Sequence, residues 1–303
     1  MKAKYNKVKD TENKEISDKL IENCGIENSE IISKAKAKSN ILKLLIVIVL
    51  IALLTVFVYY NNTHLVVTEY SYTNAKLPES IDGYCIVQIS DLHNANFGRD
   101  NEKLLEKIRI CNPDIIVITG DMVDCSGHTN IPIALSFASA ATDICPVCYI
   151  TGNHEYYLSE EQRNTFLSGL MASGVIILNS ESIELVEGVR LIGLDDNDLF
   201  HDFSNLIATE EFNIVLAHEP QRIKNYASSN ADLVFSGHAH GGQIRLPIIG
   251  GLAAPDQGFN PEYSEGLIHY NNTDMIISRG LGNSAFPFRI FNYPEIVCVR
   301  FTK

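Results

Sequence analysis

Residues 86–93 read IVQISDLH, a short apolar run that ends in polar residues. Four later segments repeat this arrangement: IIVITGD at 115–121, YITGNHE at 149–155, IVLAHEP at 214–220 and LVFSGHAH at 233–240. Each run has the length and composition of a fully buried strand, so the polar residues are expected where strands end. Ligands of open α/β sheets bind at the carboxyl ends of strands, which makes these five segments the candidate functional site.

Helices and strands are expected to alternate from residue 86 onward. The apolar spacing predicts strands over 86–90, 114–119, 148–151 and 175–178, with helices over 101–110, 131–141 and 160–172 between them. Strand, helix, strand in this order implies parallel neighbours with right-handed crossovers. Further strands are expected over 182–185, 189–193, 212–217, 233–236 and 275–278, with one helix at 221–227. This order favours an α/β fold in which a pair of mixed sheets is flanked by helices.

An apolar stretch of transmembrane length precedes the strands. It reads ILKLLIVIVLIALLTVFVYY from Ile41 to Tyr60 and is long enough to cross about 30 Å of hydrocarbon as a helix. No small-x-small cleavage pattern follows, so an uncleaved signal anchor is expected rather than a cleaved signal peptide. Four Lys lie within 34–43, whereas residues 61–80 contain only Lys76. The positive-inside rule therefore predicts a single-pass protein of the cell membrane with a cytoplasmic amino terminus and an extracytoplasmic domain.

Composition suggests the remaining boundaries. Residues 1–40 carry nine Lys and seven acidic residues, and are expected to form a cytoplasmic tail that is disordered or transiently helical. A linker with an edge strand at 64–72 is expected over 61–80, followed by one domain over 81–303. The chain carries a net charge of −13, which leaves about −15 after residue 40. A domain this acidic is not expected to bind nucleic acid, because phosphate backbones are bound by Lys and Arg in quantity.

The polar residues of the five segments have the chemistry of a two-metal site. Two divalent cations about 3.5–4 Å apart need one shared carboxylate, for which Asp121 is the natural candidate, and further Asp, His and Asn donors. Asp91 and His93, like His238 and His240, lie two residues apart and are expected to share one face of an extended segment. A lone His at a strand end is usually an ordinary polar residue, but the coincidence of all seven favours metal binding. The candidate metal ligands are Asp91, His93, Asp121, Asn153, His218, His238 and His240.

Glycines stand directly before three of the clusters, at Gly120, Gly152 and Gly237. A backbone without Cβ can turn sharply there and bring the following side chains onto the ions. A purely structural fold has no need of Gly at these successive strand ends.

These segments resemble the calcineurin-like metallophosphoesterase family. The resemblance rests on DLH at 91–93, GD at 120–121, GNHE at 152–155, the segment around His218, and GHAH at 237–240, and it runs from about residue 84 onward. GHAHGGQIRLP and the later ISRGLGNSAFPFRIFNYPEI are similar to a membrane-associated branch of YkuE-, YaeI- and lipid A precursor pyrophosphatase-like proteins. The resemblance implies a four-layer α/β/β/α sandwich of two mixed sheets, here preceded by one transmembrane helix. It also implies two divalent metal ions, with Mn, Fe or Zn as candidates.

The resemblance assigns one ion to Asp91, His93, Asp121 and His240, and the other to Asp121, Asn153, His218 and His238. It implies that His154, which is not a ligand, contacts the phosphate and stabilises or protonates the leaving oxygen. A hydroxide that bridges both metals would attack phosphorus. Asn94, Arg99 and Arg245 are weaker candidates for substrate contacts, and Glu155 is expected to support its loop through a hydrogen bond.

The expected function is that of a membrane-anchored, metal-dependent phosphoesterase. Its substrate would be a phosphodiester, pyrophosphate or phosphomonoester, with lipid-linked and cell-wall-linked esters among the candidates. The chain is expected to act as a monomer. The alternative is a metal-stabilised protein that binds envelope polymers without catalysis. The apolar segment LPIIGGLAAP at 246–255 either contacts membrane or an acyl chain, or packs on the domain.

Two further features have structural interpretations. Asp195 and Asp196, in LIGLDD, are expected in a turn after a strand rather than as extra ligands. The CPVC segment from Cys145 to Cys148 lacks a thioredoxin-like context, so packing or a disulfide is favoured over redox chemistry. Six cysteines would lie outside the cytoplasm, an even number that permits disulfides.

Overall fold

The computed structural model describes residues 2–125, 129–198, 203–284 and 286–303. The chain forms two compact units, Met1–Phe57 and Val58–Lys303. Helix α1, Lys2–Thr63, makes up the described part of the first unit and continues into the second. The tail expected to lack fixed structure is thus helical here. Its many Lys, Glu, Ala and Ile residues tolerate a helix, and the apolar helix that follows removes the cost of nucleation.

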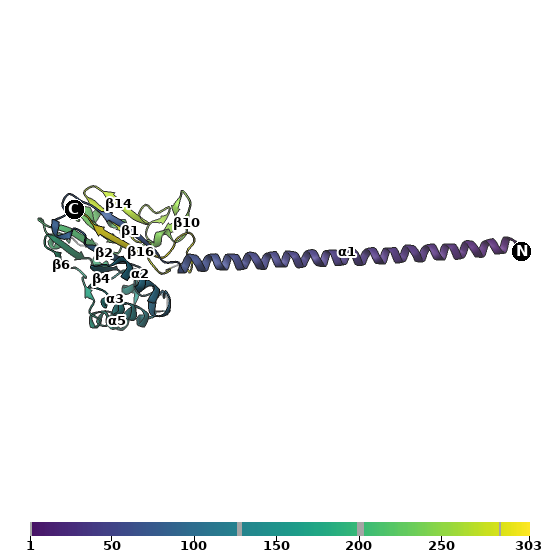
Figure 1. Cartoon of the computed structure of the whole chain (residues 1–303), viewed down its shortest axis with the longest axis horizontal. Coiled ribbons are helices and arrows are strands. Elements are labelled where there is room, and N and C mark those ends of the chain that lie inside the picture. The colour runs from purple at the N-terminus through teal and green to yellow at the C-terminus, as the bar shows by residue number, and fades with distance from the viewer. Residues whose placement is uncertain (1, 126–128, 199–202, 285) are drawn as a thin grey trace. The chain divides into compact units, whose positions relative to one another are not determined.

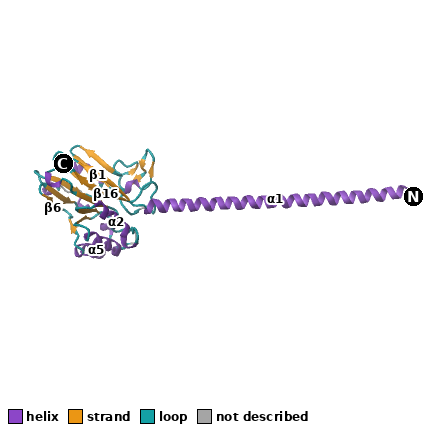
Figure 2. Ribbon diagram, viewed as in Figure 1, coloured by secondary structure: helices purple, strands orange, loops and turns teal. Residues whose placement is uncertain are grey.

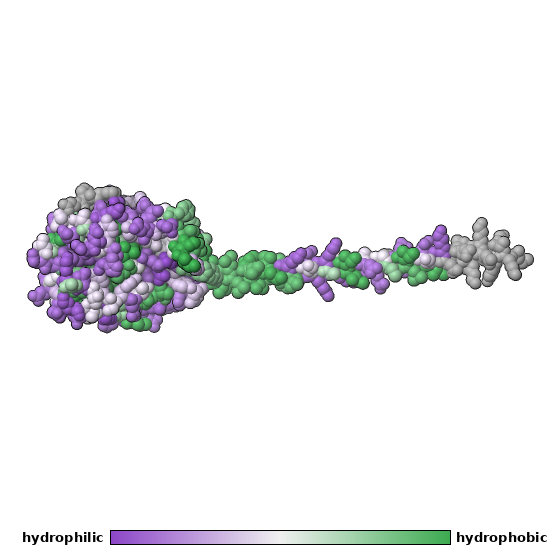
Figure 3. Space-filling model, turned by 90° about the horizontal axis from the view of Figure 1, so that it is seen from above, coloured by the Kyte–Doolittle hydropathy of each residue, from purple (hydrophilic) through white to green (hydrophobic). Residues whose placement is uncertain are grey.

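Among the described residues, α1 is the one helix long and apolar enough to cross a membrane. Its large apolar side chains from Ile41 to Val56 are exposed, and Figure 3 shows them as a continuous hydrophobic stretch. A core helix of a soluble protein would bury such side chains.

The second unit begins at Val58, well before the expected boundary at residue 81. Strand β1, Val66–Tyr72, lies at the edge of a sheet and pairs in parallel with β16, Glu295–Phe301. Leu65, Tyr72 and Leu77 are buried. The expected edge strand is therefore confirmed, but the segment around it belongs to the folded unit because its side chains fill the core.

The first large sheet has the strand order β1-β16-β2-β3-β4-β5. Strands β2 to β5 are parallel, and β16 runs antiparallel to β2. The sequence did not predict β16, which lies between β1 and β2. The remaining strands of this sheet are β2 Cys85–Ile89, β3 Ile115–Thr119, β4 Val147–Ile150 and β5 Ile176–Ile177.

The second large sheet has the order β14-β15-β9-β8-β7-β6 and is also mixed. Its four central strands are parallel, and each edge strand is antiparallel to its neighbour. The strands are β6 Glu181–Val186, β7 Val189–Gly193, β8 Phe212–Leu216, β9 Leu233–Ser236, β14 Gly266–Tyr270 and β15 Thr273–Ile277. The two mixed sheets confirm the expected fold class.

Helices cover the outer faces of the sheets, as the separation of helices and strands in Figures 1 and 2 shows for α2, α3 and α5. The α-helices of this unit are α2 Glu102–Cys111, α3 Ile131–Thr142, α4 Asn153–Tyr157, α5 Glu160–Ala172 and α6 Ile223–Ser228. Short 3-10 turns occupy Glu79–Ile81, Arg99–Asn101, Asp196–Asp198, Ser204–Leu206, Pro220–Arg222 and His240–Gly242.

Three buried apolar clusters separate four layers. The first lies between α2, α3, α5 and the first sheet, where Leu104 and Phe137 pack. The second lies between the two sheets and includes Val117 and Phe235, and the third, beyond the second sheet, includes Tyr226 of α6. The alternation of side chains along each strand supplies both faces of each sheet with apolar residues, which explains why the strands read as unbroken apolar runs.

Two small hairpins follow the last polar segment. Strands β10, Arg245–Leu246, and β11, Gly250–Gly251, form the first hairpin. Strands β12, Ala253–Ala254, and β13, Gly258–Phe259, form the second.

All seven cysteines are free thiols in this structure. Cys148 is buried between the sheets, whereas Cys145 packs against the helix-covered face of the first sheet. The CPVC segment thus contributes packing to two different cores.

Candidate metal centre

The five polar segments meet at the carboxyl ends of five strands. Three of these strands, β2, β3 and β4, belong to the first sheet, and two, β8 and β9, belong to the second. The parallel direction within each sheet places the strand ends at one edge. The topology therefore brings these segments together at the strand ends, where the sequence predicted the site.

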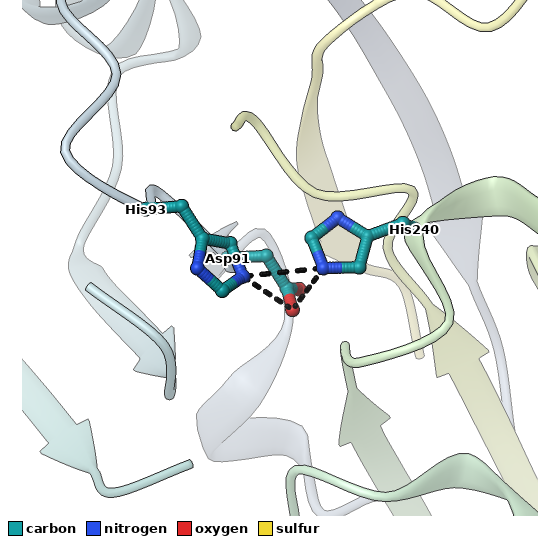
Figure 4. Close-up of side chains that lie close together, drawn as sticks. All are labelled: Asp91, His93 and His240. Carbon is teal, nitrogen blue, oxygen red and sulfur yellow. Dashed lines mark hydrogen bonds and ion pairs between the residues drawn. The ribbon is translucent and has the colours of Figure 1, made fainter. Parts of the chain in front are cut away.

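Asp91, His93 and His240 form one candidate cation site. One ligand atom from each lies within 4.8 Å of the others, and all three side chains are buried (Figure 4). Nε2 of His93 is 3.2 Å from Nε2 of His240, which in turn is 3.5 Å from Oδ1 of Asp91. Two ring nitrogens and a carboxylate oxygen thus lie close enough together to coordinate one cation.

Asp121, His218 and His238 form a second candidate site by the same criterion. Oδ1 of Asn153 lies 3.2 Å from Nε2 of His218 and 3.0 Å from Nδ1 of His238, so the amide oxygen joins this group. Oδ2 of Asp121 lies 3.2 Å from Nε2 of His218 and 3.4 Å from Nε2 of His93. One carboxylate oxygen therefore stands between the two groups, which is the position of a shared ligand.

Electrostatics favour cations at this position. Burial alone would raise the pKa of Asp121, but the adjacent His218 holds it well below its ordinary value. Burial would likewise lower the pKa of His218, but Asp121 raises it well above its ordinary value. The buried carboxylate thus requires a positive partner, and a proton on His218 fills that role when no ion does.

His93 and His240 are instead held neutral. Burial lowers the pKa of His93 to about 4, against the opposing effect of Asp121. Burial, His93 and Arg289 hold the pKa of His240 well below its ordinary value. Neutral imidazole is the form that binds metals.

Five of the seven candidate ligands have left-handed backbone conformations. The φ angles are 50° for Asp91, 43° for His93, 53° for Asp121, 64° for His238 and 48° for His240. The expectation that the i, i+2 pairs share a face of an extended segment is therefore wrong, because sharp turns bring these side chains together. Such conformations each cost roughly 1–3 kcal/mol and persist where function requires them.

The three glycines before the clusters are needed for close packing as much as for turning. Only Gly120 has a positive φ, 92°, and a Cβ there would lie 2.7 Å from Nδ1 of His218. A Cβ on Gly152 would overlap the Asp121 carboxylate, and one on Gly237 would overlap Ser90 and Asp91. The absence of a side chain at each of these glycines therefore allows the neighbouring ligand segments to pack closely together.

Glu155 holds the Asp121 turn, as the sequence led us to expect. Its Oε2 accepts hydrogen bonds from the backbone N–H of Asp121 at 3.0 Å and of Gly152 at 2.8 Å. Its Oε1 accepts one from the N–H of Met122 at 2.8 Å. Burial and Asp121 raise the pKa of Glu155 to about 8, while these N–H groups oppose the shift. The buried carboxyl group thus joins the β3 and β4 ends into one rigid element.

His154 belongs to neither of these two groups, although it forms a further cluster with His93 and Asp124 in which the ligand atoms lie within 4.8 Å of one another. Its ring is 4.4 Å from the His93 ring, and Nε2 is 4.0 Å from Oδ2 of Asp121. Nδ1 faces Asp124 at 3.4 Å and Cys125 Sγ at 3.2 Å. The side chain keeps 14% of its surface exposed, so Nε2 can reach a molecule that enters the site.

The three weaker candidates for substrate contacts, Asn94, Arg245 and Arg99, lie outside the two ligand groups. Oδ1 of Asn94 accepts a hydrogen bond from the N–H of Asn130, and its φ is 58°. Arg245 forms an ion pair with Glu265 and donates to the Gly241 carbonyl at 3.1 Å. Arg99 is exposed beside Asp100. The guanidinium of Arg245 is thus held by a carboxylate, and its contact with a substrate stays a prediction.

The structure adds three neighbours that sequence reasoning missed. Arg289 is fully buried, with Nη2 3.4 Å from Nδ1 of His240. Oδ2 of Asp256 lies 2.9 Å from Nε2 of His238, and Oγ of Ser284 lies 3.4 Å from Nε2 of His154. None of the three follows an apolar strand, so the pattern that identified the ligands could not find them.

The expected turn at Asp195 and Asp196 is present, since a 3-10 turn follows β7. Asp195 accepts hydrogen bonds from the Tyr156 hydroxyl, from Oγ1 of Thr151 at 3.3 Å and from the N–H of Asn197 at 3.0 Å. Its carboxylate therefore orders the loop after β4 and is not directed at the candidate ligands.

The donor set fits divalent cations. Two carboxylates, four imidazoles and one amide oxygen converge in a buried place, and mixed N/O shells of this kind suit Mn, Fe or Zn. Fold and site together define a metal-dependent hydrolase.

Comparison with known proteins agrees with this class. Residues 85–242 match the family model for calcineurin-like phosphoesterases. YkuE, an uncharacterized metallophosphoesterase of Bacillus subtilis, is 28% identical over 78% of this chain and 86% of its own. YkoQ, another uncharacterized metallophosphoesterase of that organism, is 31% identical over 70% of this chain and 81% of its own. LpxG of Chlamydia trachomatis, a UDP-2,3-diacylglucosamine pyrophosphatase, is 27% identical over 77% of this chain and 88% of its own.

The chain belongs to the calcineurin-like phosphoesterase family. Members use a dimetal centre, and this chain has candidate residues for one.

Proposed function

We propose that this chain is a membrane-anchored phosphoesterase with a binuclear metal centre. It hydrolyses a phosphodiester, a pyrophosphate or a phosphomonoester outside the cytoplasm. The observation that carries the proposal is the pair of ligand groups that share Asp121, with His154 at their edge. Family membership supports hydrolysis over the alternative of an envelope-binding protein without catalysis.

The seven ligands are assigned by proximity. Asp91, His93 and His240 would hold one ion, and Asn153, His218 and His238 the other, with Asp121 shared. Bound divalent cations supply Lewis-acid stabilisation of the phosphoryl oxygens and lower the pKa of a water nucleophile. The Thr119 carbonyl, 2.7 Å from Nδ1 of His218, keeps the proton on that nitrogen and leaves Nε2 as the donor atom.

His154 is assigned to the leaving group. Its backbone N–H donates to Oδ1 of Asp121 at 2.9 Å, which fixes the residue against the shared ligand. Asp124 and Cys125 face Nδ1, so Nε2 is the atom that contacts the phosphoryl or leaving oxygen. A proton or hydrogen bond from Nε2 would stabilise negative charge as it develops on that oxygen.

The test is an assay of the full chain in detergent. Purified protein should contain close to two divalent ions by elemental analysis, and should hydrolyse bis-p-nitrophenyl phosphate after loading with Mn²⁺. Folded, metal-loaded protein that hydrolyses none of a panel of monoesters, diesters and pyrophosphates would refute the proposal.

The apolar part of α1 serves as the anchor in this proposal, with residues 1–40 as a cytoplasmic tail and the unit from Val58 onward outside. The distribution of Lys around residues 41–60 supports that orientation. Cys24 is exposed and would be cytoplasmic, whereas Asp100 is exposed on the second unit.

Thiol labelling measures the orientation. In intact cells, a membrane-impermeant maleimide should label Asp100→Cys in a chain that also carries Cys24→Ser. It should label Cys24 of the natural chain only after permeabilisation. The reverse order of labelling would place the phosphoesterase unit in the cytoplasm.

A further inference from the structure

Large apolar side chains stand exposed on the segments that follow the metal-ligand cluster of β9. Ile248 is fully exposed and Ile249 is 60% exposed at the tip of the β10–β11 hairpin. Phe259 of β13 is 83% exposed, and Phe286 and Phe291 are each about half exposed. Figure 3 shows strongly hydrophobic side chains gathered on the surface of this unit. Exposed apolar groups on neighbouring segments mark a contact surface.

The hairpin tip is costly to keep in water. The side chain of Ile248 is fully exposed and gains nothing from burial. Packing within the unit therefore does not account for this residue, whereas insertion of the tip into a bilayer would.

These segments are joined to the residues through which the chain enters the second unit. Oδ1 of Asn61 accepts a hydrogen bond from the N–H of Phe291 at 2.6 Å. Oδ1 of Asn62 accepts one from the N–H of Arg289 at 3.0 Å. The N–H of Arg245, in β10, donates to the Ile290 carbonyl at 2.9 Å. Within the second unit, these segments are thus hydrogen-bonded to Asn61 and Asn62, in the last turn of α1.

An apolar pocket lies between these segments and the metal-ligand cluster. It encloses about 280 Å³ and is lined by Ala239, His240, Gln243, Ala253, Ala254, Pro255, Ser284 and Phe286. His240 is a candidate ligand, and Ser284 faces Nε2 of His154. The pocket therefore borders the candidate cation site at His240 and is otherwise lined mainly by apolar side chains.

A polar pocket borders the second candidate cation site. It encloses about 450 Å³, and its lining includes Asn153, Asp256, Arg222 and Lys224. Asn153 is a candidate ligand of the second ion and His240 of the first, so each pocket borders one of the two candidate sites. A substrate with an apolar end, a central phosphoester and a polar end matches this arrangement.

We propose that the substrate is a phosphoester of a membrane lipid. Its acyl chain enters the pocket beside His240, its polar part lies toward Asn153, and the hairpin tip at Ile248 and Ile249 inserts into the bilayer. The inference rests on the proposed phosphoesterase function and adds the class of substrate.

The first test uses two diesters that differ only in their apolar part, methyl p-nitrophenyl phosphate and dodecyl p-nitrophenyl phosphate. In both, a P–O bond to water oxygen forms and the P–O bond to nitrophenolate breaks. The full chain in mixed micelles should favour the dodecyl ester by at least about tenfold in kcat/KM, because burial of the alkyl chain in the pocket stabilises the bound substrate. Ala253→Leu, which fills the pocket, should abolish that preference by lowering kcat/KM for the dodecyl ester far more than for the methyl ester.

Ala75→Leu is the matched control, because Ala75 is exposed and lies outside the pocket lining. This variant should keep the preference for the dodecyl ester. Equal kcat/KM for the two esters in the natural chain would overturn the assignment of the pocket. Hydrolysis of neither ester would instead count against the phosphoesterase function itself.

The second test measures membrane contact and needs no activity. The chain contains no Trp, so Ile248→Trp introduces a single fluorophore. In liposomes that contain lipids brominated on their acyl chains, its fluorescence should fall by at least half relative to unbrominated liposomes. Ile110→Trp is the control, because Ile110 is 75% exposed on α2. Equal quenching at the two positions, or quenching at neither, would overturn the docking surface.

Discussion

Replacement of Asp121 by Asn is expected to remove both metal ions and with them nearly all activity. Oδ2 of Asp121 is directed at His218 in one ligand group and at His93 in the other. Asn keeps the size of the side chain, and its carbonyl oxygen can still accept the hydrogen bond from the N–H of His154. Its amide nitrogen then faces the candidate sites, where it has no lone pair for a cation. A single change therefore weakens both sites.

Metal content and thermal stability measure this effect without an assay of hydrolysis. Mn²⁺ should raise the unfolding temperature of the natural chain, because an ion that binds only the folded state stabilises it by mass action. The unfolding temperature of Asp121→Asn should hardly respond to Mn²⁺, and its metal content should fall below one ion. Asp100→Asn is the matched control, because Asp100 is exposed beside Arg99. Two ions retained in Asp121→Asn would show that this carboxylate is not the shared ligand.

The location of the site could be predicted because it depends on local pattern and topology. An apolar run such as Ile115–Thr119 identifies a buried strand, and parallel strands bring their carboxyl ends to one edge of a sheet. The residues after each run therefore meet even though Asp91 and His238 lie far apart in the chain. The alternation of polar and apolar residues over 64–72 separately predicted an edge strand, and β1 lies at the edge of the first sheet.

Features that depend on partners distant in sequence could not be predicted. Strand β16 has an apolar run like the others, but its place between β1 and β2 is set by pairing with both. Arg289 reaches His240 only because its guanidinium is buried and donates to the carbonyls of Gly282 and Arg279. The left-handed turns at Asp91 and His93 likewise depend on contacts with the segment after β3, where the N–H of His93 donates to the Asp121 carbonyl.

The continuous helix over residues 2–40 is another feature that composition alone could not predict. A segment with many charges and few aromatics cannot form its own core, which favours disorder. Helix α1 needs no core, since its hydrogen bonds are internal and it extends a helix that is already formed. Composition therefore indicates that no globular unit forms there but does not exclude a single extended helix.

Replacement of His154 by Ala is expected to lower kcat by roughly two or more orders of magnitude, as for loss of a general acid, while both metal ions remain. The ions are expected to remain because the two groups that share Asp121 do not include His154, which instead clusters with His93 and Asp124, and because its backbone N–H still donates to Asp121 after the change. The loss should depend on the leaving group. Diphenyl phosphate, whose phenolate leaves poorly without a proton, should lose more rate than bis-p-nitrophenyl phosphate.

His269→Ala is the matched control, because His269 is 70% exposed and pairs only with Asp274 among the described residues. It should leave kcat and the metal content unchanged. A metal-replete His154→Ala protein with the natural kcat on both diesters would exclude His154 from catalysis. An equal loss on both would assign it to the phosphoryl oxygens instead, because a hydrogen bond to those oxygens does not depend on how readily the leaving group departs.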